Sequence, residues 1–215
     1  MNETNEEFLR QIIEYLQKLD YIKPGEIPNI DLYMDQVTTF MDEHLAHGKR
    51  FEDDKILTKT MINNYTKNRL LPPPNKKKYS KEHMLLLIFI YYFKNILSIH
   101  DIQSIFNPLL EKFAGNKSDI NLEMVYEEVF GYEKEQVDLL VRDVVRKYKS
   151  AEKAFEGKVE DGEDREFLIS FTFICILAFD VYMKKVIIER MIDQHLSSYS
   201  KGNAEDSKEK KNAKE

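Results

Sequence analysis

Residues suited to recognising nucleic acid are concentrated in the segment from Thr58 to His83. If Thr58–Asn68 forms a helix, its polar side chains fall on two neighbouring rows spaced by four residues, which carry amide, hydroxyl and ammonium groups and no carboxylate. An Asn amide bonds two edge atoms of adenine in the major groove, whereas Thr and Lys reach other base edges or phosphates. The pattern favours a helix that reads DNA, and a solvated surface helix is the alternative. The predicted reading face comprises Lys59, Thr60, Asn63, Asn64 and Lys67.

The charge distribution of the chain favours a polyanionic partner. The whole chain carries a formal net charge of −6. Between Lys55 and Lys81, however, there are eight basic residues and no acidic one. A basic segment within an acidic protein marks a patch that attracts a polyanion. We therefore expect double-stranded DNA as the partner, with further contacts from the basic side chains of Arg69, Lys76, Lys77 and Lys78.

An all-α fold is expected from composition and periodicity. Seven Gly and six Pro among 215 residues are few, and long stretches repeat apolar residues at helical spacing. We expect an N-terminal amphipathic helix in residues 1–26, a DNA-binding domain in 27–115, a helical dimerisation or effector region in 116–199 and a disordered tail in 200–215. After the amphipathic helix, the predicted helices are Asp31–Leu45, Thr58–Asn68, Lys81–Asn95, one capped by Ser98, Leu122–Val129, Glu133–Phe155 and Arg165–Leu196.

Other classes of function find little support in the sequence. The single cysteine, Cys175, fits a reducing cytoplasm and is expected to lie inert in the core. His44 and His47 lack an evident third zinc ligand, and phosphate-binding, dinucleotide and nucleophile motifs are missing, so we expect neither enzyme activity nor a cofactor. The longest apolar run, Phe167–Phe179, has 13 residues, whereas a membrane span needs roughly 20. We therefore expect a soluble, cytoplasmic protein that does not associate with membranes.

Four short motifs follow one another in a fixed order around the basic segment: Ile62-Asn-Asn-Tyr65, Leu70-Leu-Pro-Pro-Pro74, Tyr79-Ser-Lys-Glu-His83 and Ile99-His-Asp-Ile102. In this order they resemble the recognition helix, the start of the wing, and the third and fourth helices of a MerR-type winged-helix head. Within that superfamily, the chain looks most similar to the bacterial domain-of-unknown-function family 1836. The resemblance covers roughly residues 27–113, and its signature includes Asp31-Leu-Tyr-Met-Asp-Gln36.

This resemblance implies roles for particular residues and a helix-turn-helix head. Asn63 occupies the place of the recognition-helix Arg, and Tyr65 that of a tyrosine whose hydroxyl meets the DNA backbone. Lys76–Lys78 fall in the wing, where the family places basic residues on phosphate. Arg69 stands where the family has Gly, which leaves the shape of that turn open. Several wing residues are missing before Tyr79, so the resemblance implies a short or absent hairpin.

The C-terminal region is expected to bring two copies together. MerR-type proteins dimerise through C-terminal helices, and two-fold symmetry suits a palindromic operator. Here the candidate helices are Glu133–Phe155 and Arg165–Leu196; the first half of the latter is apolar nearly all round, which predicts that it is buried. Asp180 marks where that helix emerges toward polar surroundings or contacts a ligand.

The expected function is that of a sequence-specific transcription regulator that reads its operator as a homodimer. One alternative is a helical protein–protein interaction module that has kept the head fold without DNA binding. The other is a small-molecule sensor, with a pocket among Phe167, Phe171, Phe173 and Tyr182.

Overall fold

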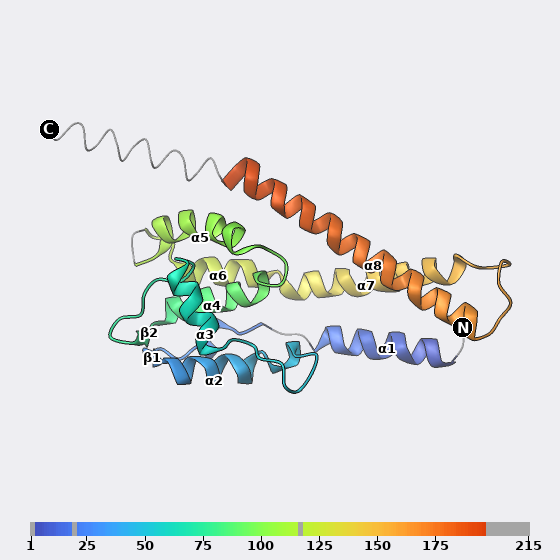
Figure 1. Cartoon of the computed structure of the whole chain (residues 1–215), viewed down its shortest axis with the longest axis horizontal. Coiled ribbons are helices and arrows are strands. Elements are labelled where there is room, and N and C mark those ends of the chain that lie inside the picture. The colour runs from blue at the N-terminus through green and yellow to red at the C-terminus, as the bar shows by residue number, and fades with distance from the viewer. Residues whose placement is uncertain (1–2, 19–20, 116–117, 197–215) are drawn as a thin grey trace. The chain divides into compact units, whose positions relative to one another are not determined.

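The structure, a computed structural model, describes residues 3–18, 21–115 and 118–196, and these residues are predominantly helical (Figure 1). The all-α fold is thus confirmed, with one two-stranded antiparallel sheet as the exception. The tail predicted to be disordered, residues 200–215, lies outside the described residues.

The chain divides into two compact units. One combines Met1–Tyr21 with Phe130–Val186, and we call it the helical unit; the other combines Ile22–Val129 with Ile187–Glu215, and we call its continuous part, Ile22–Val129, the head. The helical unit contains α1 (Glu3–Gln17), α7 (Glu133–Lys153) and most of α8 (Glu163–Met191), which runs into a π-helical turn, η3 (Ile192–Leu196). The head contains η1 (Pro24–Glu26), β1 (Leu32–Tyr33), α2 (Met34–His44), η2 (Ala46–Gly48), α3 (Lys59–Lys67), β2 (Lys78–Tyr79), α4 (Lys81–Phe93), α5 (Ile99–Phe113) and α6 (Leu122–Gly131).

The head is built around α4, whose middle is apolar on every side. All seven residues of Met84–Ile90 are buried, so this short helix has neighbours all round. The ring of Phe89 meets Phe106 of α5 and Tyr126 of α6 edge to face, at centroid distances of 6.4 and 5.4 Å. Such aromatic pairs add to the free energy gained from burial alone. Because α4 is fixed in this way, it provides a rigid base for the elements at its N-terminal end.

A short ribbon joins that end of α4 to the start of α2. Strand β1 pairs antiparallel with β2, in a register that sets Leu32 opposite Tyr79 and Tyr33 opposite Lys78. Leu32 and Tyr79 are both buried, whereas Tyr33 is exposed. The sequence reading placed Asp31 and Leu32 at the start of a helix; these residues instead precede α2, because strand β2 holds the backbone of residues 32–33 extended.

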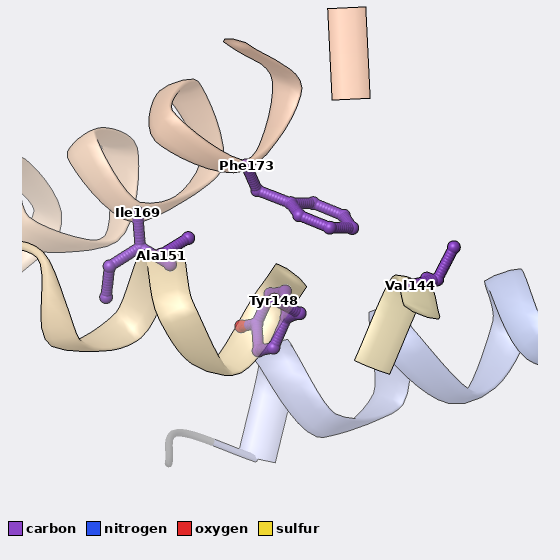
Figure 2. Close-up of a cluster of buried hydrophobic side chains, with 5 residues drawn as sticks. All are labelled: Val144, Tyr148, Ala151, Ile169 and Phe173. Atoms are coloured by element: carbon purple, nitrogen blue, oxygen red, sulfur yellow. The ribbon is translucent and has the colours of Figure 1, made fainter. Parts of the chain in front are cut away.

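The helical unit has its own small core, shown in Figure 2. Val144, Tyr148 and Ala151 of α7 face Ile169 and Phe173 of α8, and the rings of Tyr148 and Phe173 meet edge to face at 5.3 Å. Apolar residues of α1 pack against the same cluster: Leu9, Ile12 and Leu16. These three residues and Val144, Tyr148 and Ala151 thus form the packing surfaces of α1 and α7, whereas other apolar side chains of the two helices, such as Phe8, Tyr15 and Leu140, are exposed.

The prediction that the first half of α8 is buried was wrong for the single chain. Ile169 and Phe173 are buried, but Phe167, Phe171 and Ile174 are 67, 54 and 63% exposed. Cys175, expected in the core, is exposed as well. A helix that is apolar all round needs cover on every side, and α7 and α1 cover only one.

Among the described residues, Glu163–Leu196 is the one helical segment long and apolar enough to cross a membrane by length and composition. Core helices of other proteins meet the same criterion. Counting only uninterrupted apolar residues missed this segment, because 18 residues of this helix stay apolar on average even with the charged Asp180 among them.

Candidate nucleic-acid interface

The polar face of α3 turns away from the head core. Thr58 caps the helix, its Oγ1 accepting a hydrogen bond from the Met61 N–H at 3.1 Å. Ile62 and Tyr65 lie on the opposite side and are buried, which fixes the rotation of the helix about its axis. All five residues of the predicted reading face are consequently exposed: Lys59, Thr60, Asn63, Asn64 and Lys67.

Tyr65 is the candidate site residue that the fold places differently. Its side chain is 9% exposed, and burial raises the pKa of its phenol. Its backbone carbonyl accepts a hydrogen bond from the Leu70 N–H at 2.9 Å. Tyr65 therefore contributes to the core under α3 and to the turn that ends the helix.

That turn contains Arg69 in a left-handed backbone conformation, with φ of 57°. The N–H of Arg69 donates to the Thr66 carbonyl at 3.1 Å, beside the bond from Leu70 to Tyr65, and together these form a Schellman motif. The position after the C-cap in this motif usually holds Gly. The turn thus has the shape that a Gly would give it, and Arg69 adopts that shape with an exposed side chain.

The segment in which a short or absent wing was expected forms a hairpin of minimal length. The backbones of Asn75 and Lys78 exchange two hydrogen bonds, of 2.9 and 3.0 Å. The two residues between them, Lys76 and Lys77, have φ of 48° and 65°. Positive φ at both central residues defines a type I′ turn, for which Asn-Gly is the favoured sequence. We call Asn75–Lys78 the basic turn; Lys76 and Lys77 are exposed at its tip, and Lys78 lies over the ring of Tyr33 with Nζ 5.2 Å from the centroid.

The described non-glycine residues with a left-handed backbone conformation all carry a positive charge, which that conformation does not require. Among the described residues, the non-glycine positions with positive φ are Arg69, Lys76 and Lys77, and all three are basic. A residue with a Cβ in this region costs roughly 1–2 kcal/mol. Sparsely populated conformations that persist in this way tend to cluster at functional sites. The strained residues follow the reading face in the sequence and belong to the same unit.

Asp35 is a component of this surface that the sequence reading missed. It lies in the first turn of α2 and forms an ion pair with Lys59 of α3. Both side chains are largely exposed, so the pair contributes little to stability. The segment is free of acids in the sequence, but packing brings this carboxylate from another helix to one edge of the reading face.

Side chains from neighbouring helices donate hydrogen bonds to backbone carbonyls at both ends of α3 and so position it. Nζ of Lys94, in the residue after α4, donates to the Ile56 carbonyl at 2.6 Å, and burial lowers the pKa of this lysine. At the other end, the side-chain amide of Gln103 in α5 donates to the Asn68 carbonyl. The helix is thus held from α4 and α5 and does not depend on its own nine residues for its position.

His83 closes the start of α4 and lies close to the proline run before the basic turn. The Ser80 N–H donates to Nδ1 of His83 at 3.1 Å, which satisfies one of the free donors at the helix start. Burial lowers the pKa of His83 below its ordinary value, and the backbone groups of Pro72 and Pro73 partly oppose this shift. The imidazole is therefore neutral at neutral pH, with Nδ1 available as an acceptor.

Acidification is expected to destabilise the head through His83. Because its pKa is lower in the folded state, the unfolded chain takes up a proton first as the pH falls below about 6.5, and stability falls with it. When the pH is lowered from about 7.5 to 5.5, the free energy of unfolding should fall in both proteins. We expect the fall to be up to about 1 kcal/mol smaller in His83→Asn than in the wild type. Thermal melting across this range measures the difference. His100→Asn, at an exposed position on α5, is the control and should follow the wild type.

The competing candidate sites have local partners. Nδ1 of His44 lies 2.9 Å from the Phe40 carbonyl, and its ring stacks on Phe40. Asp180 pairs with Lys147 and Lys184 at 2.7 and 2.9 Å, and these hydrogen bonds lower the pKa of its carboxyl. No cluster of three or more His, Cys, Asp or Glu side chains suited to a metal ion occurs within the described ranges.

The proposed effector pocket is not formed as the sequence suggested. Phe173 is buried against Tyr148, whereas Phe167, Phe171 and Tyr182 are exposed on α8. These four aromatic residues therefore do not enclose a cavity together.

The head matches the model of a protein family. No curated protein and no solved structure was found to match the chain. A family model described as a domain of unknown function (DUF1836) matches residues 22–129. These limits are those of the head, so the family match coincides with the continuous part of one compact unit, and it includes all but the last two residues of α6. Since the match covers half of the sequence, the chain belongs to the DUF1836 family.

Proposed function

We propose that this protein is a sequence-specific transcription regulator that binds double-stranded DNA through its head. The observation that carries the proposal is the chemistry of the strained positions. Arg69, Lys76 and Lys77 are cationic in conformations that favour glycine. Their cost to folding is understandable if their charges are needed, and phosphate is the partner that fits exposed guanidinium and ammonium groups.

In this proposal, α2 and α3 act as a helix-turn-helix and the basic turn as a reduced wing, in the manner of MerR-type heads. Helix α3 enters the major groove and presents Asn63 and Asn64 to base edges, while Lys59, Lys67 and Arg69 hold the flanking backbone. Lys76–Lys78 contact phosphates at one side. Binding of this kind requires no cofactor and no catalytic residue, and it suits a cytoplasmic protein. A homodimer would place two reading helices on a palindromic operator.

Equilibrium binding tests the proposal directly. Fluorescence anisotropy of the whole protein with fragments of its own upstream region should reveal a site bound at least about a thousandfold more tightly than random DNA. Across a salt series, the logarithm of the association constant should fall linearly with that of the salt concentration. Equal affinity for all fragments, or no dependence on salt, would contradict sequence-specific DNA binding and favour a protein–protein interaction module.

Replacing Asp35 is expected to strengthen DNA binding. Asp35→Asn removes the carboxylate that pairs with Lys59 and leaves this lysine free to bind phosphate. Affinity should rise severalfold on operator and random DNA alike, because the gain is electrostatic. Asp138→Asn, at an exposed position of α7, makes the same change in net charge and should have less effect. If the two variants gained equally, the proximity of Asp35 to the interface would be disproved.

A further inference from the structure

Helix α8 has an exposed face that is apolar over four turns. The opposite face of α8 packs against α7 and α1 through Ile169 and Phe173. The side chains of the exposed face point away from these two helices. Between Glu166 and Lys184, the one charged residue is Asp180, which is half-buried and paired with Lys147. We call this face the α8 stripe; its exposed residues are Phe167, Phe171, Ile174, Cys175, Ala178, Phe179, Val181 and Tyr182.

The α8 stripe is large enough to form a stable interface. Its four aromatic rings are 54–67% exposed. Each ring therefore exposes roughly 100 Å², and together they supply about half of the roughly 800 Å² that each partner contributes to a standard interface. Apolar patches of this extent on a protein surface mark a contact with another molecule.

The spacing of the stripe fits another helix. Phe167, Phe171, Ile174, Ala178 and Val181 follow one another at alternating steps of four and three residues. This is the seam of a two-helix coiled coil, in which each apolar side chain enters a hole between residues of the facing helix. An open groove of about 530 Å³ adjoins the seam and offers room for such a side chain; it is lined by Phe171, Cys175, Phe179, Met183 and the Lys147–Asp180 pair.

The two ends of the α8 stripe carry opposite charges, so two copies of it are complementary when they run antiparallel. Glu163 and Asp164 precede it, and Lys184 and Lys185 follow it. We propose that a second copy of this chain covers the α8 stripe by pairing its own α8 antiparallel, centred near Ile174. Phe167 of one copy then lies near Val181 of the other, and the acidic pair near the basic pair. A parallel pair would set like charges against each other at both ends, which is unfavourable.

This inference specifies the interface of the homodimer in the proposed function, and it is tested without DNA. The whole protein should sediment as a dimer at micromolar concentration. Ile174→Glu, which places an unpaired charge on the seam, should weaken self-association roughly a hundredfold or more. Ile174 is 63% exposed in the single chain, so the circular dichroism spectrum should be unchanged. Phe51→Glu, at an exposed aromatic residue of the head, is the matched control and should remain dimeric.

Charge reversal tests the orientation. Replacing Glu163 and Asp164 with Lys should weaken the dimer, and replacing Lys184 and Lys185 with Glu should do the same. The chain carrying all four changes should regain it, since opposite charges again meet at both ends. Failure of the fourfold variant to recover, with its fold intact by circular dichroism, would overturn the antiparallel arrangement.

A chemical cross-link and a membrane assay complete the test. Cys175 is the single cysteine and lies next to the proposed centre, so a short bismaleimide should join two chains, and Ile174→Glu should abolish the product. A wild-type monomer in sedimentation would overturn the proposal. So would flotation of the protein with phosphatidylglycerol vesicles when that flotation is lost in Ile174→Glu, because the stripe would then face lipid. Neither result bears on whether the head alone binds a half-site, so this proposal and the proposed function fail separately.

Discussion

Replacing Asn63 and Asn64 together with Ala is expected to lower the affinity for the operator by roughly 2–6 kcal/mol and to change the affinity for random DNA little. Both amides lie on the exposed face of α3, opposite the buried Ile62 and Tyr65. An amide that pairs with adenine contributes on the cognate sequence and has no equivalent partner elsewhere. Anisotropy titrations of the double variant against both DNAs measure the two losses.

Two observations serve as controls. Lys67→Ala, at the edge of the reading face, should weaken both DNAs alike, because a phosphate contact carries no sequence information. The melting temperature of the double Asn variant should stay near that of the wild type, since exposed positions contribute little packing. A large fall in melting temperature would instead identify the two amides as structural and contradict their assignment to base reading.

The second large effect is expected at the basic turn. Changing Lys76 to Asn and Lys77 to Gly gives the favoured sequence for a type I′ turn and removes two charges. We expect the head to become more stable by about 1 kcal/mol. The change relieves the strain of the left-handed conformation, and the entropic cost of ordering Gly offsets part of that gain. Binding should weaken on every DNA sequence, and the log–log salt slope should flatten by about two units.

Replacing Lys76 and Lys77 with Ala separates the two parts of this prediction. The Ala variant loses the same charges but keeps residues with a Cβ at positive φ, so it should bind DNA as weakly as the Asn-Gly variant without its gain in melting temperature. An unchanged salt slope in both variants would mean that the basic turn does not touch DNA.

Much of the fold followed from local signals in the sequence. Ser98 and the apolar spacing after it predicted a helix, and α5 begins at Ile99 with Ser98 as its cap. Likewise, the alternation of buried and polar positions in residues 58–68 predicted which side of α3 is exposed, because a nine-residue helix anchored by Ile62 and Tyr65 has one orientation available.

What escaped prediction depends on contacts between distant residues. The ion pair of Asp35 with Lys59 requires that α2 and α3 pack together, and spacing along the chain says nothing about it. The type I′ turn could not be predicted, because its central residues are Lys76 and Lys77 and not the Asn and Gly that are typical of this turn. The exposure of α8 was not predicted, because an apolar helix is expected to be buried. The sequence does not show whether the residues that bury it belong to the same chain or to another molecule.

The connections between the two units have a consequence for how the chain is made. The chain leaves the helical unit at Tyr21 and returns at Phe130, and these two rings stack at 5.3 Å. The Tyr21 N–H also donates to Glu133, 112 residues further along. On a ribosome, α1 therefore emerges long before α7 and waits without its packing partner until the entire head has been synthesised. The head can fold during that interval, so the helical unit closes after the head, and the folded head shortens the distance over which the two halves of the helical unit must find each other.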